Sequence, residues 1–146
     1  MKQKLLFVVA ICLMFFTSCE TRDDECDFVF PKQPIAGISI VDSEGNSLIG
    51  EDNVYKPSEI TLSDGAEEIP LEFIEFREVT RMSFYFGFMI SEKKYFLKLN
   101  ETETDTINMT IHAYPTKCFG MMKEIEKFSV NGEEIEGEGD IYVIQK

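Results

Sequence analysis

Residues 81–90, Arg81-Met82-Ser83-Phe84-Tyr85-Phe86-Gly87-Phe88-Met89-Ile90, place an apolar side chain at every second position. A β-strand directs successive side chains to opposite faces, so this period of two predicts a strand with one apolar face. That face comprises Met82, Phe84, Phe86, Phe88 and Ile90. Burying each phenylalanine contributes roughly 1.5–3 kcal/mol. We therefore expect this strand to carry the centre of the core, with Arg81, Ser83, Tyr85 and Gly87 on the opposite face.

Shorter alternating segments lie on both sides of this strand. Downstream, residues 91–93 predict a turn, and residues 94–99 predict a returning strand with Tyr95, Leu97 and Leu99 on one face. Residues 106–113 alternate again, with Pro115 expected to end the strand, and their inward residues are Ile107, Met109, Ile111 and Ala113. Upstream, short runs bounded by turn formers predict strands over residues 37–41, 47–49, 60–62 and 69–76.

The alternation slips within residues 69–76. Leu71 and Phe73 fall on one face of the expected strand, whereas Ile74 and Phe76 fall on the other. A slip of one residue turns every later side chain over. The pattern therefore predicts either a β-bulge near Phe73 and Ile74 or burial on both faces.

Residues 121–127 fit either a short helix or a strand, because Met121, Ile125 and Phe128 also have helical spacing. The following Asn131-Gly132 favours the strand, since this dipeptide is the strongest short-range hairpin signal. We expect residues 124–130 to pair with residues 133–136, and residues 141–144 to close the sheet.

About eight to nine short strands without a clear helix predict an all-β domain spanning residues 28–146. An antiparallel β-sandwich is the first expectation and a small barrel the second. The strand order cannot be derived from the sequence. Residues 38–42, followed by Gly45, Leu48 and Gly50, resemble the opening of transthyretin-like, carboxypeptidase-regulatory-like and immunoglobulin-like β-sandwich domains.

The N-terminus has the parts of an export signal. Lys2 and Lys4 precede the apolar residues 5–16, and Thr17-Ser18 lead to Cys19. This apolar run is shorter than the ~20 residues that a membrane-spanning helix needs. Residues 16–19 resemble a lipobox, which implies removal of residues 1–18 and lipidation of Cys19. The alternative is an ordinary signal peptide in which Cys19 has no role.

Residues 20–25, Glu-Thr-Arg-Asp-Asp-Glu, resemble the acidic export tag of Bacteroidota-type surface lipoproteins. The resemblance implies a lipid-anchored protein of the outer membrane that faces the cell surface, with residues 19–27 as a tether. Removing Lys2 and Lys4 leaves 12 basic against 27 acidic residues, a net charge of −15. A chain with this negative charge repels nucleic acid and anionic lipid head groups. Attachment to a bilayer would therefore come from the lipid on Cys19.

Two thiols remain after removal of the signal and lipidation, those of Cys26 and Cys118. In an exported protein such a pair predicts a disulfide, which would contribute ~4–5 kcal/mol through the loop that it closes. The alternative is two separate thiols, with that of Cys118 buried.

Catalytic and metal-binding motifs are not recognisable. His112 is the only histidine and is expected on the surface, and no zinc-site spacing accompanies it. Asp42, Glu44 and Asn46 resemble half of a calcium loop, but the glycine and glutamate that complete one are misplaced, which favours a hairpin turn. Acidic residues such as Glu72, Glu75 and Glu78 are expected to form a solvated face rather than an acid and base pair. We predict a protein that is not an enzyme and needs neither metal nor cofactor.

Two kinds of surface site are predicted. Asp105-Thr106-Ile107 resembles the three-residue O-glycosylation signal of exported Bacteroidota-type proteins, which implies Thr106 as the acceptor. Tyr55, Tyr85 and Tyr114 are the candidate binding aromatics, although the absence of Trp disfavours a glycan ligand. The first functional hypothesis is a non-catalytic binding or accessory module for an envelope protein or glycan. The alternatives are a passive envelope component that self-associates through an edge strand, and an envelope hydrolase.

Overall fold

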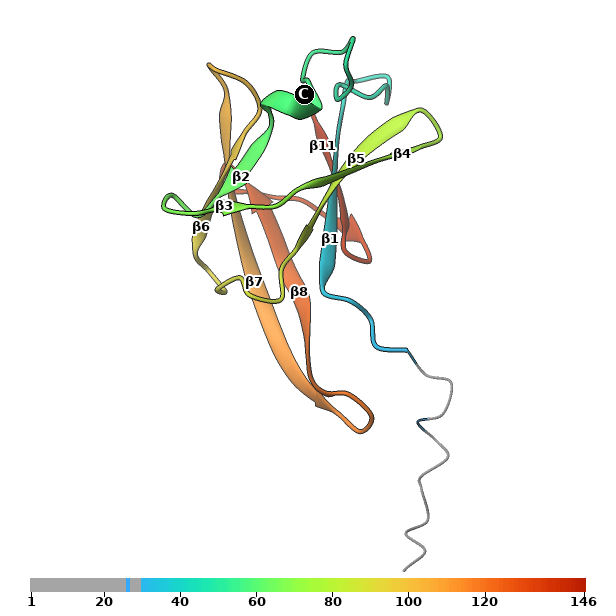
Figure 1. Ribbon diagram of the computed structural model, residues 1–146, viewed down its shortest axis with the longest axis vertical. Coiled ribbons are helices and arrows are strands. Elements are labelled where there is room, and N and C mark those ends of the chain that lie inside the picture. The colour runs from blue at the N-terminus through green and yellow to red at the C-terminus, as the bar shows by residue number, and fades with distance from the viewer. Residues whose placement is uncertain (1–25, 27–29) are drawn as a thin grey trace, which may run out of the picture. The chain divides into compact units, whose positions relative to one another are not determined.

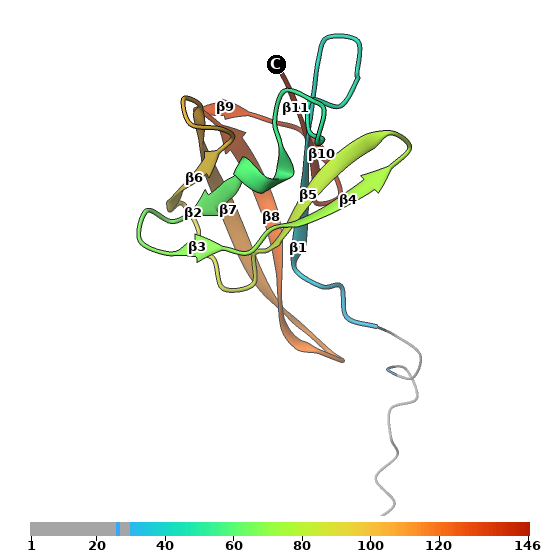
Figure 2. The same cartoon turned by 45° about the horizontal axis from the view of Figure 1, so that its top comes forward.

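In a computed structural model, which describes residue 26 and residues 30–146, two β-sheets face one another across a shared apolar core (Figures 1 and 2). Residues 31–146 form one compact unit. The predicted signal peptide of residues 1–18, the lipidation site Cys19 and all of the tether except Cys26 lie outside the described residues. These N-terminal assignments remain predictions.

The first sheet has five strands in the order β10-β11-β1-β5-β4. Their bounds are Ile35–Val41 (β1), Glu72–Phe76 (β4), Val79–Tyr85 (β5), Gly137–Glu138 (β10) and Ile141–Gln145 (β11). Strands β1 and β11 pair in parallel, and the other neighbours pair antiparallel. The N-terminal and C-terminal strands of the domain thus lie side by side at the centre of this sheet.

The second sheet has six strands in the order β3-β2-β6-β7-β8-β9, all antiparallel. Their bounds are Thr61–Ser63 (β2), Glu68–Ile69 (β3), Lys94–Lys98 (β6), Thr104–Thr116 (β7), Gly120–Val130 (β8) and Glu133–Glu134 (β9). A short 3-10 helix, Pro57–Glu59 (η2), precedes β2. The predicted all-β fold is confirmed, with more strands than expected because several are only two or three residues long.

The core is built from the inward residues of both sheets. Met82 and Phe84 of β5 are buried with Ile38 and Ile40 of β1, and the predicted inward residues Tyr95, Leu97 and Leu99 are buried opposite them. The Phe128 and Tyr142 rings stack across the core with centroids 3.9 Å apart. This contact joins β8 of one sheet to β11 of the other.

The central strand is shorter than the sequence predicts. β5 ends at Tyr85, and although Phe86 is still buried, Phe88 is 89% exposed and Ile90 is 61% exposed. The Met89 N–H donates to the Phe86 carbonyl over 3.0 Å, and this turn shifts the phase by one residue. Met89 is therefore buried in place of its two neighbours, and the expectation that Phe88 and Ile90 point inward is wrong.

The expectation for residues 69–76 is also wrong. The register between β4 and β5 contains no bulge in these residues, and Ile74 and Phe76 are more than half exposed. Instead, the strand breaks at Pro70 and Leu71, where the chain crosses from β3 in one sheet to β4 in the other. The slip in the pattern marks this change of sheet.

Three smaller expectations need correction. Residues 47–49 form only isolated bridges to Val41 and Tyr55 rather than a strand. Pro115 does not end β7, which continues to Thr116. The pairing of β7 with β6 stops at Asn108, so this far part of β7 is a sheet edge, where a missing N–H is tolerated. For the same reason Ala113 is exposed rather than buried.

Residues 121–127 are a strand, and the helical alternative is excluded. Asn131 and Gly132 connect β8 to β9 with φ angles of 53° and 86°, the conformation of the predicted two-residue hairpin.

Candidate functional site

The segment after β5, here called the 86–92 loop, holds apolar side chains in solvent on a fixed backbone. Phe86 and Met89 are buried and attach its first half to the core. The Phe86 N–H also donates to the Pro34 carbonyl over 2.8 Å. Phe88, between these two anchors, is 89% exposed, the highest exposure of any large apolar residue in the part of the chain that the structure describes.

The second half of the 86–92 loop is attached to neighbouring strands. The Glu92 N–H donates to the Met109 carbonyl over 2.7 Å, and the Ser91 Oγ accepts from the Ile111 N–H over 2.8 Å. The Ile90 N–H donates to the Tyr95 hydroxyl over 2.7 Å. Ile90 is thus displayed with its backbone held in place.

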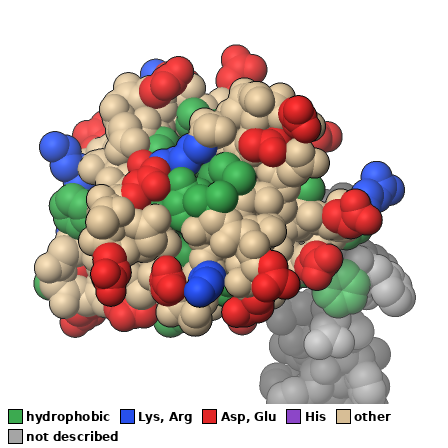
Figure 3. Space-filling view, turned by 90° about the horizontal axis from the view of Figure 1, so that it is seen from above, with side chains coloured by type: hydrophobic (Ala, Val, Ile, Leu, Met, Phe, Trp, Pro, Cys, Tyr) green, Lys and Arg blue, Asp and Glu red, His purple; other side chains and the backbone are tan. Residues whose placement is uncertain are grey.

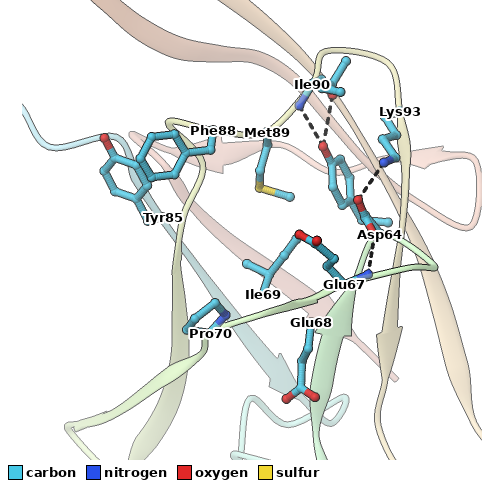
Figure 4. A pocket seen from close by; sticks show the side chains of 11 residues that line it. Asp64, Glu67, Glu68, Ile69, Pro70, Tyr85, Phe88, Met89, Ile90 and Lys93 are labelled. Carbon is cyan, nitrogen blue, oxygen red and sulfur yellow. Dashed lines mark hydrogen bonds and ion pairs between the residues drawn. The ribbon is translucent and has the colours of Figure 1, made fainter.

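Beside this loop lies a hollow of about 450 Å³, here called the Tyr85 hollow (Figure 4). It is lined by Asp64, Glu67, Glu68, Ile69, Pro70, Tyr85, Phe88, Met89, Ile90, Lys93 and Tyr95. Ile69 and Pro70 come from the crossing between the sheets. The same break that ends β3 therefore supplies one wall of the hollow.

Charge at the rim of the hollow is partly neutralised. Lys93 Nζ lies 2.7 Å from Asp64 Oδ2, and Asp64 Oδ1 accepts from the N–H groups of Ala66 and Glu67. The bond from Lys93, together with these amides, holds the pKa of the Asp64 carboxyl well below its usual range, and Asp64 in turn raises the pKa of Lys93. Glu67 points into the hollow, whereas Glu68 points away from it (Figure 4). The unpaired charge facing the hollow is therefore negative.

Tyr85 is the residue around which this surface is organised. Its ring lines the Tyr85 hollow and two adjacent hollows of about 270 Å³ and 240 Å³. The Phe88 ring lies 5.1 Å away, tilted by 54°. A side chain at Gly87 would place its Cβ 2.4 Å from the Tyr85 ring, so only glycine allows this approach. Lys123 of β8 closes the arrangement by donating to the Gly87 carbonyl over 2.6 Å.

The domain as a whole is acidic. Residues 30–146 contain 11 basic and 22 acidic residues, a net charge of −11. In the space-filling view acidic side chains are scattered over the visible face, and basic ones are few (Figure 3). A ligand that carries positive charge beside an apolar group would suit both the hollow and its surroundings.

The structure separates the three predicted binding tyrosines. Tyr85 lies at the hollow. Tyr55 is 4% exposed and its hydroxyl donates to Glu103 Oε2 over 2.9 Å, so it offers no open ring to a ligand. Burial and the hydrogen bond to Glu103 raise its pKa. Tyr114 lies on β7, where its ring stacks on His112 with centroids 6.1 Å apart.

The residues around Thr106 have structural roles. Asp105 is buried and receives hydrogen bonds from Lys146 and from the Asn131 amide, and Ile107 is buried in the core. Thr106 is partly exposed, and its N–H donates to Asn131 Oδ1 over 2.8 Å. The three-residue motif thus lies in a folded strand, and glycosylation of Thr106 remains a prediction.

Cys26 and Cys118 are each disulfide-bonded in the structure, and their pairing with one another remains a prediction. His112 is half exposed, with Nδ1 3.7 Å from Glu126 Oε1. The Asp42 carboxylate accepts from the N–H groups of Glu44 and Asn46 and from the Asn46 amide, so the turn itself uses it. Among the described residues, no group of His, Cys, Asp and Glu side chains has the arrangement of a metal site.

The sequence did not identify Phe88, Ile90 or Glu67 as site residues, because the alternation placed the first two in the core. Gly87 was the available signal, since a glycine beside an aromatic residue at a strand end indicates a close approach of the backbone. No helix in the described residues is long and apolar enough to cross a bilayer. The sequence matches no family model, and neither a curated protein nor a solved structure resembles it significantly.

Proposed function

We propose that this protein is a non-catalytic binding module that docks an apolar, positively charged segment of an envelope protein at the Tyr85 hollow. The exposure of Phe88 on an anchored loop beside that hollow carries the proposal. Leaving a phenylalanine in water forgoes roughly 1.5–3 kcal/mol of burial. Exposed aromatic residues beside a preformed hollow are typical of the few residues that dominate a protein interface.

A protein segment suits the hollow better than a glycan. Its walls are mainly apolar, and of its polar groups Asp64 and Lys93 are engaged with one another. A sugar needs several hydrogen-bonding partners around an aromatic platform. Glu67 instead offers one carboxylate, which suits a lysine or arginine side chain beside an apolar one.

Photo-crosslinking in intact cells tests the docking site. A benzophenone amino acid at position 88 should give a discrete protein adduct, whereas the same probe at position 96 should not. Phe96 is a matched control because it is a partly exposed phenylalanine on the outer face of β6. Replacing Ile90 with Asp should abolish the adduct at position 88. Equal labelling at both positions, or none at position 88, would contradict the proposal.

We also propose that the domain is anchored by a lipid on Cys19 to the outer membrane and faces the cell surface. The lipobox-like residues 16–19 and the acidic residues after them support this location. Lipid labelling of cells, with Cys19→Ala as the control, combined with protease treatment of intact cells, tests both parts. A label that persists in Cys19→Ala would refute the anchor, and a domain that survives protease while other surface proteins are cleaved would place it in the periplasm.

A further inference from the structure

Strand β4 is an open edge of the five-stranded sheet, because it pairs only with β5. The β4–β5 hairpin projects from the sandwich in both ribbon views (Figures 1 and 2). Ile74 and Phe76 are exposed along it. We infer that β4 pairs antiparallel with β4 of a second copy of this chain, about a twofold axis at Ile74. This interface does not depend on the Tyr85 hollow.

The backbone of β5 shows which groups of β4 are free. The Phe86 N–H donates to Pro34 and the Thr80 N–H donates to Ser47 Oγ, both on the side of β1. Alternate residues of a strand direct their backbone groups to opposite sides, so the odd-numbered residues of β5 bond to β4. The two-residue tip at Arg77 and Glu78 agrees, because its flanking pair exchanges hydrogen bonds.

The partners of these odd-numbered residues on β4 therefore direct their backbone groups to β5. They are Glu72 opposite Ser83, Ile74 opposite Arg81 and Phe76 opposite Val79. Phe73 and Glu75 direct their N–H and C=O groups to the open edge. A twofold axis at Ile74 places Phe73 opposite Glu75 of the second copy, and Glu75 opposite Phe73. The free groups of one copy therefore meet the free groups of the other as two hydrogen-bonded pairs.

The side chains are complementary about the same axis. Ile74 meets its own copy, and Phe76 lies opposite Glu72 of the other chain. The Arg77 guanidinium lies 5.1 Å from the centroid of the Phe76 ring, which brings it next to that Glu72. No glutamate of β4 opposes another glutamate in this register. The pairing thus combines an apolar centre with two Arg77–Glu72 contacts and gives the Arg77 side chain a role.

The net charge of −11 over residues 30–146 of each copy opposes association at long range. At about 0.15 M salt, interactions beyond ~8 Å are largely screened, whereas the adjacent Arg77 and Glu72 are affected less. The dimer should therefore be sought at this salt concentration rather than in dilute buffer.

Cysteine crosslinking of the purified full-length protein tests the register. Opposed Cα atoms at Ile74 would be about 4.5 Å apart, within the range of a disulfide. The two copies of Phe76 would be four residues, roughly 13 Å, apart along the strand. Under mild oxidation Ile74→Cys should yield about tenfold more dimer than Phe76→Cys, with mass spectrometry locating the bond at position 74. A mixture of Glu72→Cys and Phe76→Cys should crosslink to each other.

Equal crosslinking of Ile74→Cys and Phe76→Cys, or none in either, would overturn the inference. Charge exchange gives a second readout by sedimentation velocity. Arg77→Glu and Glu72→Arg should each lower the dimer fraction, and the double variant should restore it. A double variant that stays monomeric would overturn the register. Phe88→Ser should leave dimerisation unchanged, which distinguishes this interface from the Tyr85 hollow.

Discussion

Two hairpin tips in this domain have the same backbone conformation but residues that differ in how well they tolerate it. The β4–β5 tip consists of Arg77 and Glu78, with φ angles of 51° and 66°, and the β8–β9 tip consists of Asn131 and Gly132, with φ angles of 53° and 86°. Positive φ is natural for glycine and tolerated by asparagine, but it costs other residues roughly 1–2 kcal/mol each. One tip is thus encoded locally, whereas the other is imposed by the strands that it joins.

The two tips also differ in what depends on them. The Asn131 side chain donates to buried Asp105 and accepts from the Thr106 N–H, each over 2.8 Å, so it ties the tip to the neighbouring strand β7. Arg77 only covers the exposed Phe76 ring. A favourable tip is coupled to the core here, and an unfavourable one is confined to a projecting edge. This difference indicates that the Arg77–Glu78 tip is tolerated for its surface rather than for its stability.

Of the changes at the two tips, breaking the favourable one is expected to have the larger effect. Asn131→Ala removes two side-chain hydrogen bonds, leaves Asp105 short of a partner and places an alanine at positive φ. We expect a loss of about 2–4 kcal/mol in the free energy of unfolding. Urea denaturation with the disulfides intact measures it. Asn46→Ala is the control, because the side chain of the exposed Asn46 donates to Asp42 within its own turn, and a loss no larger than in this control would refute the coupling.

A smaller, opposite effect should come from repairing the other tip. Replacing Arg77 with Asn and Glu78 with Gly relieves the strain at both φ angles, although glycine adds entropy to the unfolded chain. We expect a net gain of about 1 kcal/mol in the free energy of unfolding. The measurement belongs at protein concentrations where the variant and the parent are both monomeric. No gain would show that context, rather than residue type, removes the strain.

The same contrast explains how much of the fold the sequence predicts. Alternation predicts β5, β6 and β7 and the all-β class, and Asn131-Gly132 predicts β8 and its hairpin, because these signals act between close neighbours. The hairpin tip at Arg77 and Glu78 has no turn signal of its own. The parallel pairing of β1 with β11 joins residues about a hundred positions apart, so no local pattern can report it.

A third turn, which contains Asp64, is held by an ion pair between the Asp64 carboxylate and Lys93. The Asp64 carboxylate accepts hydrogen bonds from Lys93 and from two backbone N–H groups. These bonds, the one from Lys93 most of all, lower its pKa in the folded protein. A lowered pKa contributes stability above the unfolded value of about 3.9, and this stability is lost as the pH falls through the folded pKa. We expect the β2–β3 turn to loosen only in strong acid.

The carboxyl resonance of Asp64, followed by NMR against pH, measures this effect. Lys93→Met should raise the titration midpoint toward the ordinary value, because it removes the largest cause of the shift. Arg77→Met removes a cation at the β4–β5 tip and should leave the midpoint unchanged. An unmoved midpoint in Lys93→Met would show that the backbone N–H groups alone hold the carboxylate charged.

The candidate site is harder to predict than the fold, because it forms where the alternating pattern of the strands ends. The sequence offers Tyr85 only as one of three candidate binding tyrosines in a chain without Trp. Phe88 and Ile90 were assigned to the core, since alternation cannot foresee that Gly87 ends the strand and shifts the phase. The Tyr85 hollow also needs Ile69 and Pro70, which the change of sheet brings beside β5. Residues from separate segments form it, so no single stretch of sequence contains its signal.

The smallest expected effect distinguishes an exposed site from a packed one. The position of Phe88, like that of the Arg77–Glu78 tip, is set by the surrounding structure rather than by the local sequence. Its side chain is 89% exposed. Phe88→Ser should therefore change the free energy of unfolding by no more than about 0.5 kcal/mol. Phe86→Ala, two residues earlier and fully buried, should cost about 3–5 kcal/mol in the same urea titration. A comparable loss in Phe88→Ser would mean that Phe88 packs into the fold, and the Tyr85 hollow would lose the side chain that makes it a docking site.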